Sequence, residues 1–301
     1  MKLKFPKDLI SIADLTEDTI FDLFGKAKII SKRKSPPKIN RKRFWGFLFL
    51  EPSTRTRLSF ERAAFEVGFS FSLFEGTKSS SLEKGETFED MIDVFIANGI
   101  HHFVIRTPQT GGLDFFRNLE DAHVINGGDG NGEHPTQALL DALTLHHFLG
   151  KKKSLKGISL LIQGDVLHSR VARSWALLGP RLGIDLKFSS PAALRPQGWG
   201  ANIPWSENPR EFQKSSQFVM AIRVQKERFE KLDQADLAFS EIEKKFCLVP
   251  KDLGQNQFVM APGPVNWGVE LDAQWREDPR SLVLEQVRWG RFLRAAVMSS
   301  F

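Results

Sequence analysis

The sequence lacks tyrosine altogether and contains a single cysteine, Cys247, among its 301 residues. The absence of tyrosine excludes every mechanism that depends on a tyrosine hydroxyl. One cysteine can form neither an internal disulfide nor a cysteine metal cluster, which agrees with a reducing compartment. No apolar run approaches the roughly 18 residues needed to span a bilayer, and no signal-peptide core follows the first residues. We therefore expect a cytoplasmic protein with no membrane partner.

Acidic residues are missing from one segment of the chain. Residues 26–43 carry nine Lys and Arg residues and no acid, which leaves 33 basic residues against 36 acidic ones elsewhere. The net charge of +6 therefore comes from this segment. The segment also lacks the aromatic residues on which nucleic-acid bases stack, so we interpret it as a solvated face and expect no nucleic-acid partner. A polyanion-binding protein is the alternative interpretation.

Apolar strands alternate with amphipathic helices along the chain, which is typical of parallel sheets covered by helices on both faces. We predict strands at Trp45–Leu50, His102–Arg106, Ala122–Asn126, Ile158–Gln163, Ile184–Phe188, Phe218–Ile222 and Phe258–Met260. Apolar residues three and four apart predict helices between them, including one that opens at Pro135 and a last one over residues 282–298. The length suits two domains, and the polar stretch 151–153 places their boundary at residue 150. The sequence thus predicts an α/β protein with domains 1–150 and 151–301.

The string Ser53-Thr54-Arg55-Thr56-Arg57 lies between the apolar run Trp45–Leu50 and the helical pattern Leu58–Val67. It places hydroxyls, guanidinium groups and backbone N–H groups at a strand-to-helix junction, where the helix dipole also favours negative charge. Arginine forks bind phosphate oxygens in pairs. A lone cluster of this kind would more often be a capped helix start, but here it predicts a phosphate site because further polar strings accompany it.

These further strings are Ser79–Thr87, Gly130–Gln137, His168–Arg173, Arg223–Arg228 and Pro262–Asn266. In content, order and spacing the whole set resembles the catalytic chains of the aspartate carbamoyltransferase family. The resemblance runs from about Leu9 to the C-terminus. Gly-Glu-His-Pro-Thr-Gln followed by a helix is the string most specific to this transferase superfamily.

The resemblance implies two domains, each a mainly parallel sheet flanked by helices, with the helix at 282–298 returning to the first domain. Residues 1–150 would bind carbamoyl phosphate and residues 151–301 would bind L-aspartate. The implied reaction transfers the carbamoyl group to the aspartate amine and gives N-carbamoyl-L-aspartate and phosphate in de novo pyrimidine biosynthesis. No cofactor is implied. We also expect no metal, because the pairs His101-His102 and His146-His147 lack the spacing of two ligands on one helix face.

The resemblance also assigns the residues of the first substrate's site. The carbamoyl phosphate-binding residues would be Ser53, Thr54, Arg55, Thr56, Ser81, Lys84, Arg106, His134 and Gln137. Of these, Arg55, Thr56, Lys84, Arg106 and His134 are expected to act in catalysis. Thr56, Arg106 and His134 would face the carbamoyl oxygen, and Gln137 would bind the carbamoyl amide. Arg106 ends a predicted parallel strand, which is where ligands bind in open sheets.

The second substrate is a dicarboxylate, for which the second domain should supply cations and hydrogen-bond donors. The aspartate-binding residues implied by the resemblance are Lys84, Arg170, Arg223, Gln225, Pro262 and Gly263. In the family, the residues that match Ser81 and Lys84 reach into a neighbouring subunit's site. The chain is therefore expected to form a homotrimer with shared active sites, and the family also admits regulatory or dihydroorotase-like partner chains.

Two departures from the family pattern are Ala261 and Trp267, which stand where many relatives have a histidine and an arginine. They bear on lid geometry and substrate affinity, since the principal ligand positions are retained. An ornithine carbamoyltransferase would carry His-Cys-Leu-Pro and Asp-Ser-Met-Gly strings, which are absent here, so aspartate is favoured. An inactive paralogue that serves as a binding or regulatory subunit would have lost a phosphate ligand, and none is lost.

Overall fold

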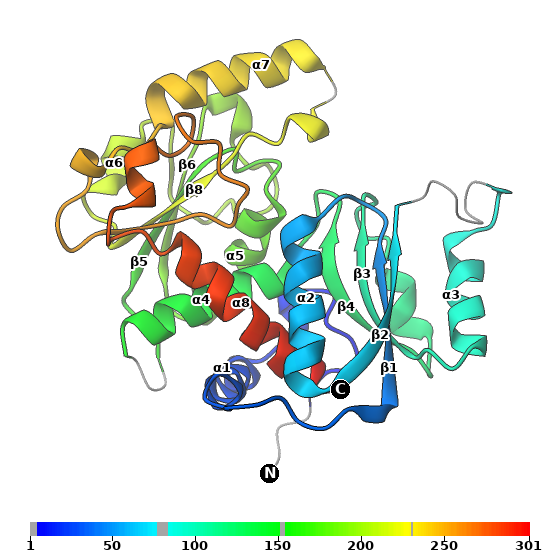
Figure 1. Ribbon diagram of the computed structural model, residues 1–301. Coiled ribbons are helices and arrows are strands. Elements are labelled where there is room, and N and C mark those ends of the chain that lie inside the picture. Colours follow the sequence, from blue (N-terminus) through cyan, green and yellow to red (C-terminus); the bar gives the residue numbers. More distant parts are fainter. Residues whose placement is uncertain (1–4, 77–83, 151–153, 230) are drawn as a thin grey trace. The chain divides into compact units, whose positions relative to one another are not determined.

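The computed structural model describes residues 5–76, 84–150, 154–229 and 231–301, with the backbone alone for residues 40–42. The chain forms two compact units, Met1–Leu140 with Trp289–Phe301, and Asp141–Arg288 (Figure 1). It passes from one unit to the other within two helices, α4 (Pro135–Phe148) and α8 (Val283–Met298). The final helix thus contributes its C-terminal part to the first unit, as predicted. The assignment of residues 1–150 and 151–301 to two substrates stays a prediction.

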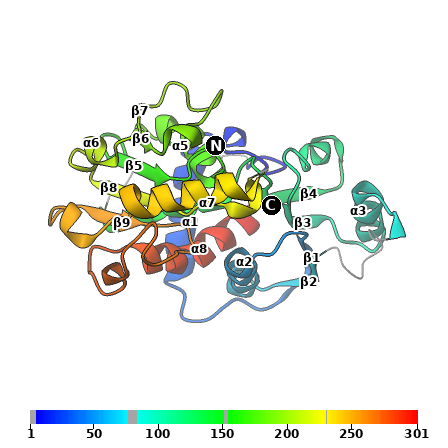
Figure 2. The same ribbon diagram turned by 90° about the horizontal axis from the view of Figure 1, so that it is seen from above.

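The first unit contains a four-stranded parallel sheet in the order β2-β1-β3-β4. Its strands are β1 (Asn40–Phe49), β2 (Phe69–Glu75), β3 (His102–Thr107) and β4 (His123–Asp129), and its other helices are α1 (Glu17–Ser31), α2 (Thr54–Val67) and α3 (Phe88–Ala97). Figures 1 and 2 show α2 and α3 on opposite faces of this sheet. Alternating side chains of β1 explain this arrangement, because Phe47 contacts the Phe60 ring of α2 whereas Leu48 packs with Met91 of α3.

The second unit contains a five-stranded parallel sheet in the order β7-β6-β5-β8-β9. Its strands are β5 (Ser159–Gly164), β6 (Asp185–Ser189), β7 (Trp205–Ser206), β8 (Phe218–Ile222) and β9 (Phe258–Met260). Its own helices are α5 (Arg170–Arg181), α6 (Pro209–Gln213) and α7 (Leu232–Glu241). Short 3-10 helices lie at Ile12–Asp14, Asp114–Asn118, Ala192–Leu194, Lys226–Arg228, Pro250–Asp252 and Ala273–Arg276, and a π-helical turn at Ile242–Phe246. The predicted fold class, two parallel sheets flanked by helices, is confirmed.

Each predicted strand corresponds to an observed one, but two observed strands were not predicted. β2 alternates phenylalanine and serine from Phe69 to Ser72, and as the edge strand of its sheet it pairs with β1 alone. β7 is two residues long and lies in a proline-rich stretch. Both are edge strands, which pair with one neighbour each, so their sequences need not show the continuous apolar run of a strand buried in the middle of a sheet.

The C-terminal part of α8 packs on α2 within the first unit. The Arg294 guanidinium lies 5.0 Å from the centre of the Phe60 ring, and Arg291 approaches Glu66 at 3.9 Å. A Cβ atom at Gly290 would lie 3.4 Å from the Ser59 hydroxyl and 3.2 Å from Leu140, so a side chain there would have to displace its neighbours. Among the described residues, no helix is both long and apolar enough to cross a membrane.

The basic segment, residues 26–43, covers the C-terminal half of α1, a connecting stretch and the start of β1. Residues 32–39 of the connecting stretch are all exposed. Lys26 pairs with Asp22 one helical turn earlier at 2.9 Å, and the Arg43 guanidinium lies 5.6 Å from the centre of the Phe69 ring. Lys26 and Arg43 thus contact other residues of the first unit, whereas the cations of residues 32–39 are exposed.

Candidate active site

The polar motifs of the first unit lie at one edge of its sheet. β1, β3 and β4 run parallel, and Phe49 of β1 lies opposite Arg106 of β3. The residues that follow β1 and β4 are therefore close to the end of β3 that carries Arg106. The carboxyl ends of parallel strands are where ligands bind in open sheets.

α2 begins at Thr54, and Ser53 precedes its first turn. The Ser53 carbonyl accepts a hydrogen bond from the Arg57 amide at 3.2 Å, but the Ser53 hydroxyl makes no capping bond to the helix. The first turn contains no acidic residue, and the side chains of Thr54 and Arg55 are exposed. The amides of this turn and the Arg55 guanidinium thus present positive charge to an anion at the sheet edge.

Arg57, the last residue of the predicted phosphate string, has a different environment. It lies 3.5 Å from Glu61, one turn later in α2, and it forms a second ion pair with Glu75 of β2. These contacts connect α2 to the neighbouring strand. Arg57 therefore supports the junction structurally, whereas Arg55 is exposed at the helix start.

His134 lies between β4 and α4, with its ring against the start of α2. Its Nε2 atom is 3.3 Å from the Thr56 hydroxyl, and both side chains are buried. The His134 carbonyl accepts the amide of Gln137 at 3.0 Å, and Pro135 opens α4. The structure thus brings together Thr56 and His134, which are 78 residues apart, and places Gln137 in the adjacent helical turn.

Arg106 forms an ion pair that its own strand motif does not predict. Its Nη2 atom donates to Glu51 Oε1 at 3.0 Å, and Nη1 lies 3.5 Å from the Gly127 carbonyl oxygen. The Arg106 and Glu51 side chains are 11% and 19% exposed, so water screens this pair only partly. Glu51 therefore orients the guanidinium at the sheet edge. Its only local signal in the sequence is an acid two residues before the phosphate string.

The predicted aspartate-binding residues of the second unit also follow the carboxyl ends of neighbouring strands. Arg170 opens α5 after β5, Arg223 and Gln225 follow β8, and Pro262 and Gly263 follow β9. β5, β8 and β9 are consecutive in the sheet, so these residues share one edge. The side chains of Arg170 and Gln225 are buried, whereas that of Arg223 is partly exposed.

Asp165 connects the ends of two of these strands. Its side chain is fully buried, and one carboxylate oxygen lies 2.9 Å from His168 Nδ1. The other oxygen accepts the Gln225 amide at 2.9 Å. Asp165 thus holds the chain after β8 against the chain after β5, a role that no motif in the sequence indicates.

Arg223 and Glu270 supply opposite charges near this edge. Arg223 donates to both carboxylate oxygens of Glu227, with 3.1 Å between Nη1 and Oε2. Burial raises the pKa of the Glu270 carboxyl to about 7, although a hydrogen bond from the Asn266 amide (2.6 Å) and the positive charge of Arg223 act in the opposite direction. Glu270 is only 2% exposed. A carboxyl that titrates near neutrality thus lies beside the predicted substrate loop.

Lys84 and Ser81 belong to the predicted intersubunit loop. Lys84 is exposed, and Ser81 lies outside the described residues. The two departures from the family pattern have local partners, because the Ala261 amide donates to Gln286 Oε1 at 2.9 Å and the Arg276 guanidinium lies 4.8 Å from the centre of the Trp267 ring. Ala261 and Trp267 thus each have a contact within the second unit, although the histidine and arginine that many relatives carry at these positions are absent.

Two protein-family models match the chain in succession. The model for the carbamoyl-P binding domain of aspartate/ornithine carbamoyltransferase matches residues 7–147. The model for the Asp/Orn binding domain of the same enzymes matches residues 156–301. The two matches together extend over nearly the whole chain.

Individual proteins of similar sequence cover the chain over almost its full length. The chain is 36% identical over 301 residues to the aspartate carbamoyltransferase catalytic subunit of Staphylococcus carnosus, covering 97% of this chain and 94% of that protein. It is 38% identical over 303 residues to the subunit of the same name from Desulfitobacterium hafniense, with the same two coverages, 97% and 94%. Aspartate transcarbamoylase from Trypanosoma cruzi, crystallised with carbamoyl aspartate and phosphate, is similar with a TM-score of 0.88 and 27% identity, covering 99% of this chain and 96% of that one.

Proposed function

Because the chain belongs to the aspartate/ornithine carbamoyltransferase family, we propose that it transfers the carbamoyl group of carbamoyl phosphate to the amine of L-aspartate. The products are N-carbamoyl-L-aspartate and phosphate, in de novo pyrimidine biosynthesis. The observation that carries this proposal is the buried pair Thr56 and His134, 3.3 Å apart beside the exposed Arg55 at the start of α2. The choice of aspartate is supported by relatives that bear the aspartate name at 36% and 38% identity.

The first half-site has the groups that acyl transfer from a phosphate requires. The amides at the start of α2, with Ser53, Thr54 and Arg55, hold the phosphate. When the neutral amine attacks the carbonyl carbon, an electron pair moves to the carbonyl oxygen, and Thr56, Arg106 and His134 stabilise that oxygen. Gln137 orients the carbamoyl amide. Collapse of the intermediate reforms the carbonyl and expels phosphate, which takes up the proton that the attacking nitrogen loses. The protein therefore contributes position and charge rather than a covalent bond.

The second half-site selects a dicarboxylate. Arg170 and Arg223 bind the carboxylates, Gln225 binds beside the amine, and the chain at Pro262 and Gly263 supplies backbone contacts. The two guanidinium groups would repel the side-chain ammonium of ornithine, so the discrimination includes a repulsive element.

The active unit is a homotrimer in which Ser81 and Lys84 of one subunit complete the site of the next. Subunits that donate residues to one another form a closed symmetric assembly, and the family's smallest such assembly is a trimer. The test mixes inactive Lys84→Ala and Arg55→Ala proteins after reversible dissociation. Hybrid trimers should regain activity, because some sites then combine wild-type Arg55 with wild-type Lys84. Hybrids of confirmed mass that stay inactive would place Lys84 in its own subunit's site.

Residues 1–150 form the domain that binds carbamoyl phosphate, and residues 151–301 form the domain that binds aspartate. The protein acts in the cytoplasm, which agrees with its single cysteine. Regulatory or dihydroorotase-like chains are its candidate protein partners, and size-exclusion chromatography of tagged protein from its native cell would reveal them.

The reaction itself is tested by supplying the purified chain with carbamoyl phosphate and either L-aspartate or L-ornithine. Aspartate should yield equal amounts of N-carbamoyl-L-aspartate and phosphate, and ornithine should yield much less product. Faster carbamoylation of ornithine would assign the chain to the other branch of its family. Absence of transfer to either acceptor, from folded trimeric protein, would favour an inactive paralogue.

A further inference from the structure

The loop that carries His134 is closed by one buried carboxylate. Asp129, which is 5% exposed, accepts hydrogen bonds from Asn126 Nδ2 (2.9 Å), the Glu133 amide (2.7 Å) and the Gly111 amide (3.0 Å). Its own carbonyl accepts the Gly132 amide at 2.7 Å. A Cβ atom at Gly132 would lie 2.4 Å from the Asp129 carboxylate, so the turn leaves no space for a side chain. The backbone immediately before His134 is thus fixed from inside the loop.

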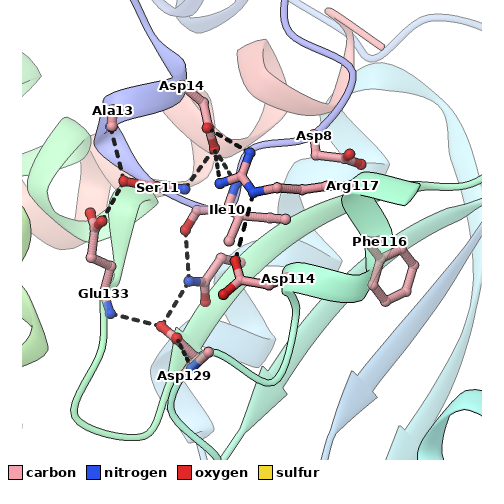
Figure 3. Close-up of polar contacts among 12 residues, drawn as sticks. Asp8, Ile10, Ser11, Ala13, Asp14, Asp114, Phe116, Arg117, Asp129 and Glu133 are labelled. Atoms are coloured by element: carbon pink, nitrogen blue, oxygen red, sulfur yellow. Dashed lines mark hydrogen bonds and ion pairs between the residues drawn. The ribbon is translucent and has the colours of Figure 1, made fainter. Parts of the chain in front are cut away.

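A second anchor comes from the N-terminal segment, residues 8–14. Leu9 pairs with β4 in parallel, since its amide donates to the Val124 carbonyl at 2.8 Å and its carbonyl accepts the Asn126 amide at 2.9 Å. Figure 3 shows the Glu133 carboxylate next to Ser11, and Ser11 in turn next to Asp14 within the same segment. The segment therefore extends along the strand that leads into the His134 loop.

Glu133, the residue directly before His134, is connected to this segment through its side chain. Its carboxylate accepts the Ser11 hydroxyl on one oxygen (Figure 3) and the Ile12 amide, at 3.1 Å, on the other. Ser11 is itself held, because its amide donates to Asp14 Oδ2 at 2.8 Å. Glu133 is thus tied at its amide by Asp129 and at its side chain by residues more than 120 positions away in the sequence.

We propose that Glu133 is a positioning residue for carbamoyl transfer, which it supports by fixing the His134 imidazole through its bonds to Ser11 and Ile12. This inference rests on the proposed function of His134. His134 follows Glu133 directly, and its ring must stay within reach of Thr56 on another element, 3.3 Å away. A displacement of about 1 Å at a reacting group can cost about a hundredfold in rate, so a bond one residue away affects turnover. The N-terminal segment then belongs to the active-site framework.

The carboxylate is replaceable by an amide with the same connections. In Glu133→Gln the side-chain oxygen can accept the Ile12 amide, and the side-chain NH₂ can donate to the Ser11 hydroxyl, which serves as donor or acceptor. Glu133→Ala removes both bonds, and Ser11→Ala removes one. We therefore expect kcat to fall about 10- to 100-fold in Glu133→Ala, to fall less in Ser11→Ala, and to be largely restored in Glu133→Gln.

The experiment measures kcat, both KM values and Tm for these variants and for the double variant Ser11→Ala/Glu133→Ala. The double variant should be no slower than Glu133→Ala, because both residues act through one connection. Both KM values should change by less than about threefold, since a displaced His134 loses more of its interaction with the oxyanion of the transition state than with the carbonyl oxygen of the bound substrate. The matched control is Thr16→Ala. The Thr16 hydroxyl caps α1 by accepting the Thr19 amide at 3.2 Å, so its loss should lower Tm without affecting the contacts of Glu133.

Equal kcat losses in Thr16→Ala and Glu133→Ala at equal Tm would overturn the proposal, as would unchanged kcat in folded Ser11→Ala and Glu133→Ala. If Glu133→Ala does not fold, Ser11→Ala and Glu133→Gln provide the comparison. A second measurement needs no turnover: the imidazole NMR signals of His134 should shift in Glu133→Ala and Ser11→Ala, and those of His102 should not. An inactive wild type with these shifts would refute the proposed function alone, whereas an active wild type with no shift would refute the positioning role.

Discussion

Replacing Thr56 by Val isolates the contribution of a single hydroxyl at the proposed carbonyl site. Thr56 is 5% exposed, and Val has nearly the same shape, so the main change is the loss of the hydroxyl 3.3 Å from His134 Nε2. A hydrogen bond contributes about 0.5 to 1.5 kcal/mol to stability, and this long one should be near the lower value. Loss of a donor to the developing oxyanion costs about 100- to 1000-fold in kcat, or about 3 to 4 kcal/mol.

The catalytic loss should therefore exceed the loss of stability by about 2 kcal/mol or more. Phosphate release under saturating substrates gives kcat, and urea unfolding gives the stability. Thr19→Val is the matched control, because Thr19 is equally buried at 5% exposure and its hydroxyl also has a side-chain partner, the Thr16 hydroxyl at 2.9 Å. The control should lose similar stability and keep its kcat.

The reasoning would be refuted by a Thr56→Val protein whose kcat stays within about fivefold of wild type, since no oxyanion donor would then have been lost. A fall in kcat matched by Thr19→Val would also refute it. In that case the effect would be a general response to a lost hydroxyl in the first unit.

Three further predictions concern other residues of the two half-sites. Arg55→Ala should lower kcat/KM for carbamoyl phosphate by about a hundredfold or more with an unchanged Tm, because the side chain is exposed; normal kinetics would remove Arg55 from the phosphate site. Arg223→Ala should raise KM for aspartate far more than KM for carbamoyl phosphate, and equal rises in the two constants would contradict the separation of the half-sites. The Glu270 carboxyl has a pKa of about 7 when folded against an ordinary value of 4.5, so the folded state binds more protons between these pH values and stability falls as pH rises through them. Glu270→Gln keeps an acceptor for the Asn266 amide, and its free energy of unfolding should exceed that of the wild type by on the order of 3 kcal/mol at pH 8 but by little at pH 4. Urea unfolding at the two pH values measures this difference. An equal difference at both pH values would mean that burial does not raise this pKa.

The phosphate string could be predicted because all the features that indicate an anion site there lie close together in the sequence. Ser53 to Thr56 combine hydroxyl and guanidinium groups at a junction that the adjacent apolar run and helical pattern define by themselves. The structure has α2 starting at Thr54, one residue after the first of these side chains. The roles of the individual residues remain predictions, which the variants above test.

The partners of the predicted residues could not be found in the same way. Glu51 meets Arg106 because β1 and β3 pair with Phe49 opposite Arg106, and a shift of one residue in that register would turn the side chains to the other face. Asp165 meets the Gln225 amide for the same reason, since it follows β5 and Gln225 follows the adjacent β8. Neither pairing leaves a local pattern in the sequence.

The sequence by itself determined the family, the alternation of strands and helices, and the polar strings at the strand ends, because periodicity and motif chemistry depend on residues close together in the chain. Only the tertiary structure decided that Glu133, directly before His134, is held by Ser11 and Ile12, and that the edge strand β2 joins the sheet. These features join segments far apart in the sequence, and their free energy comes from hydrogen bonds and burial that exist only once both segments are in place. Local sequence can specify each partner, but the packed sheet selects which partners meet.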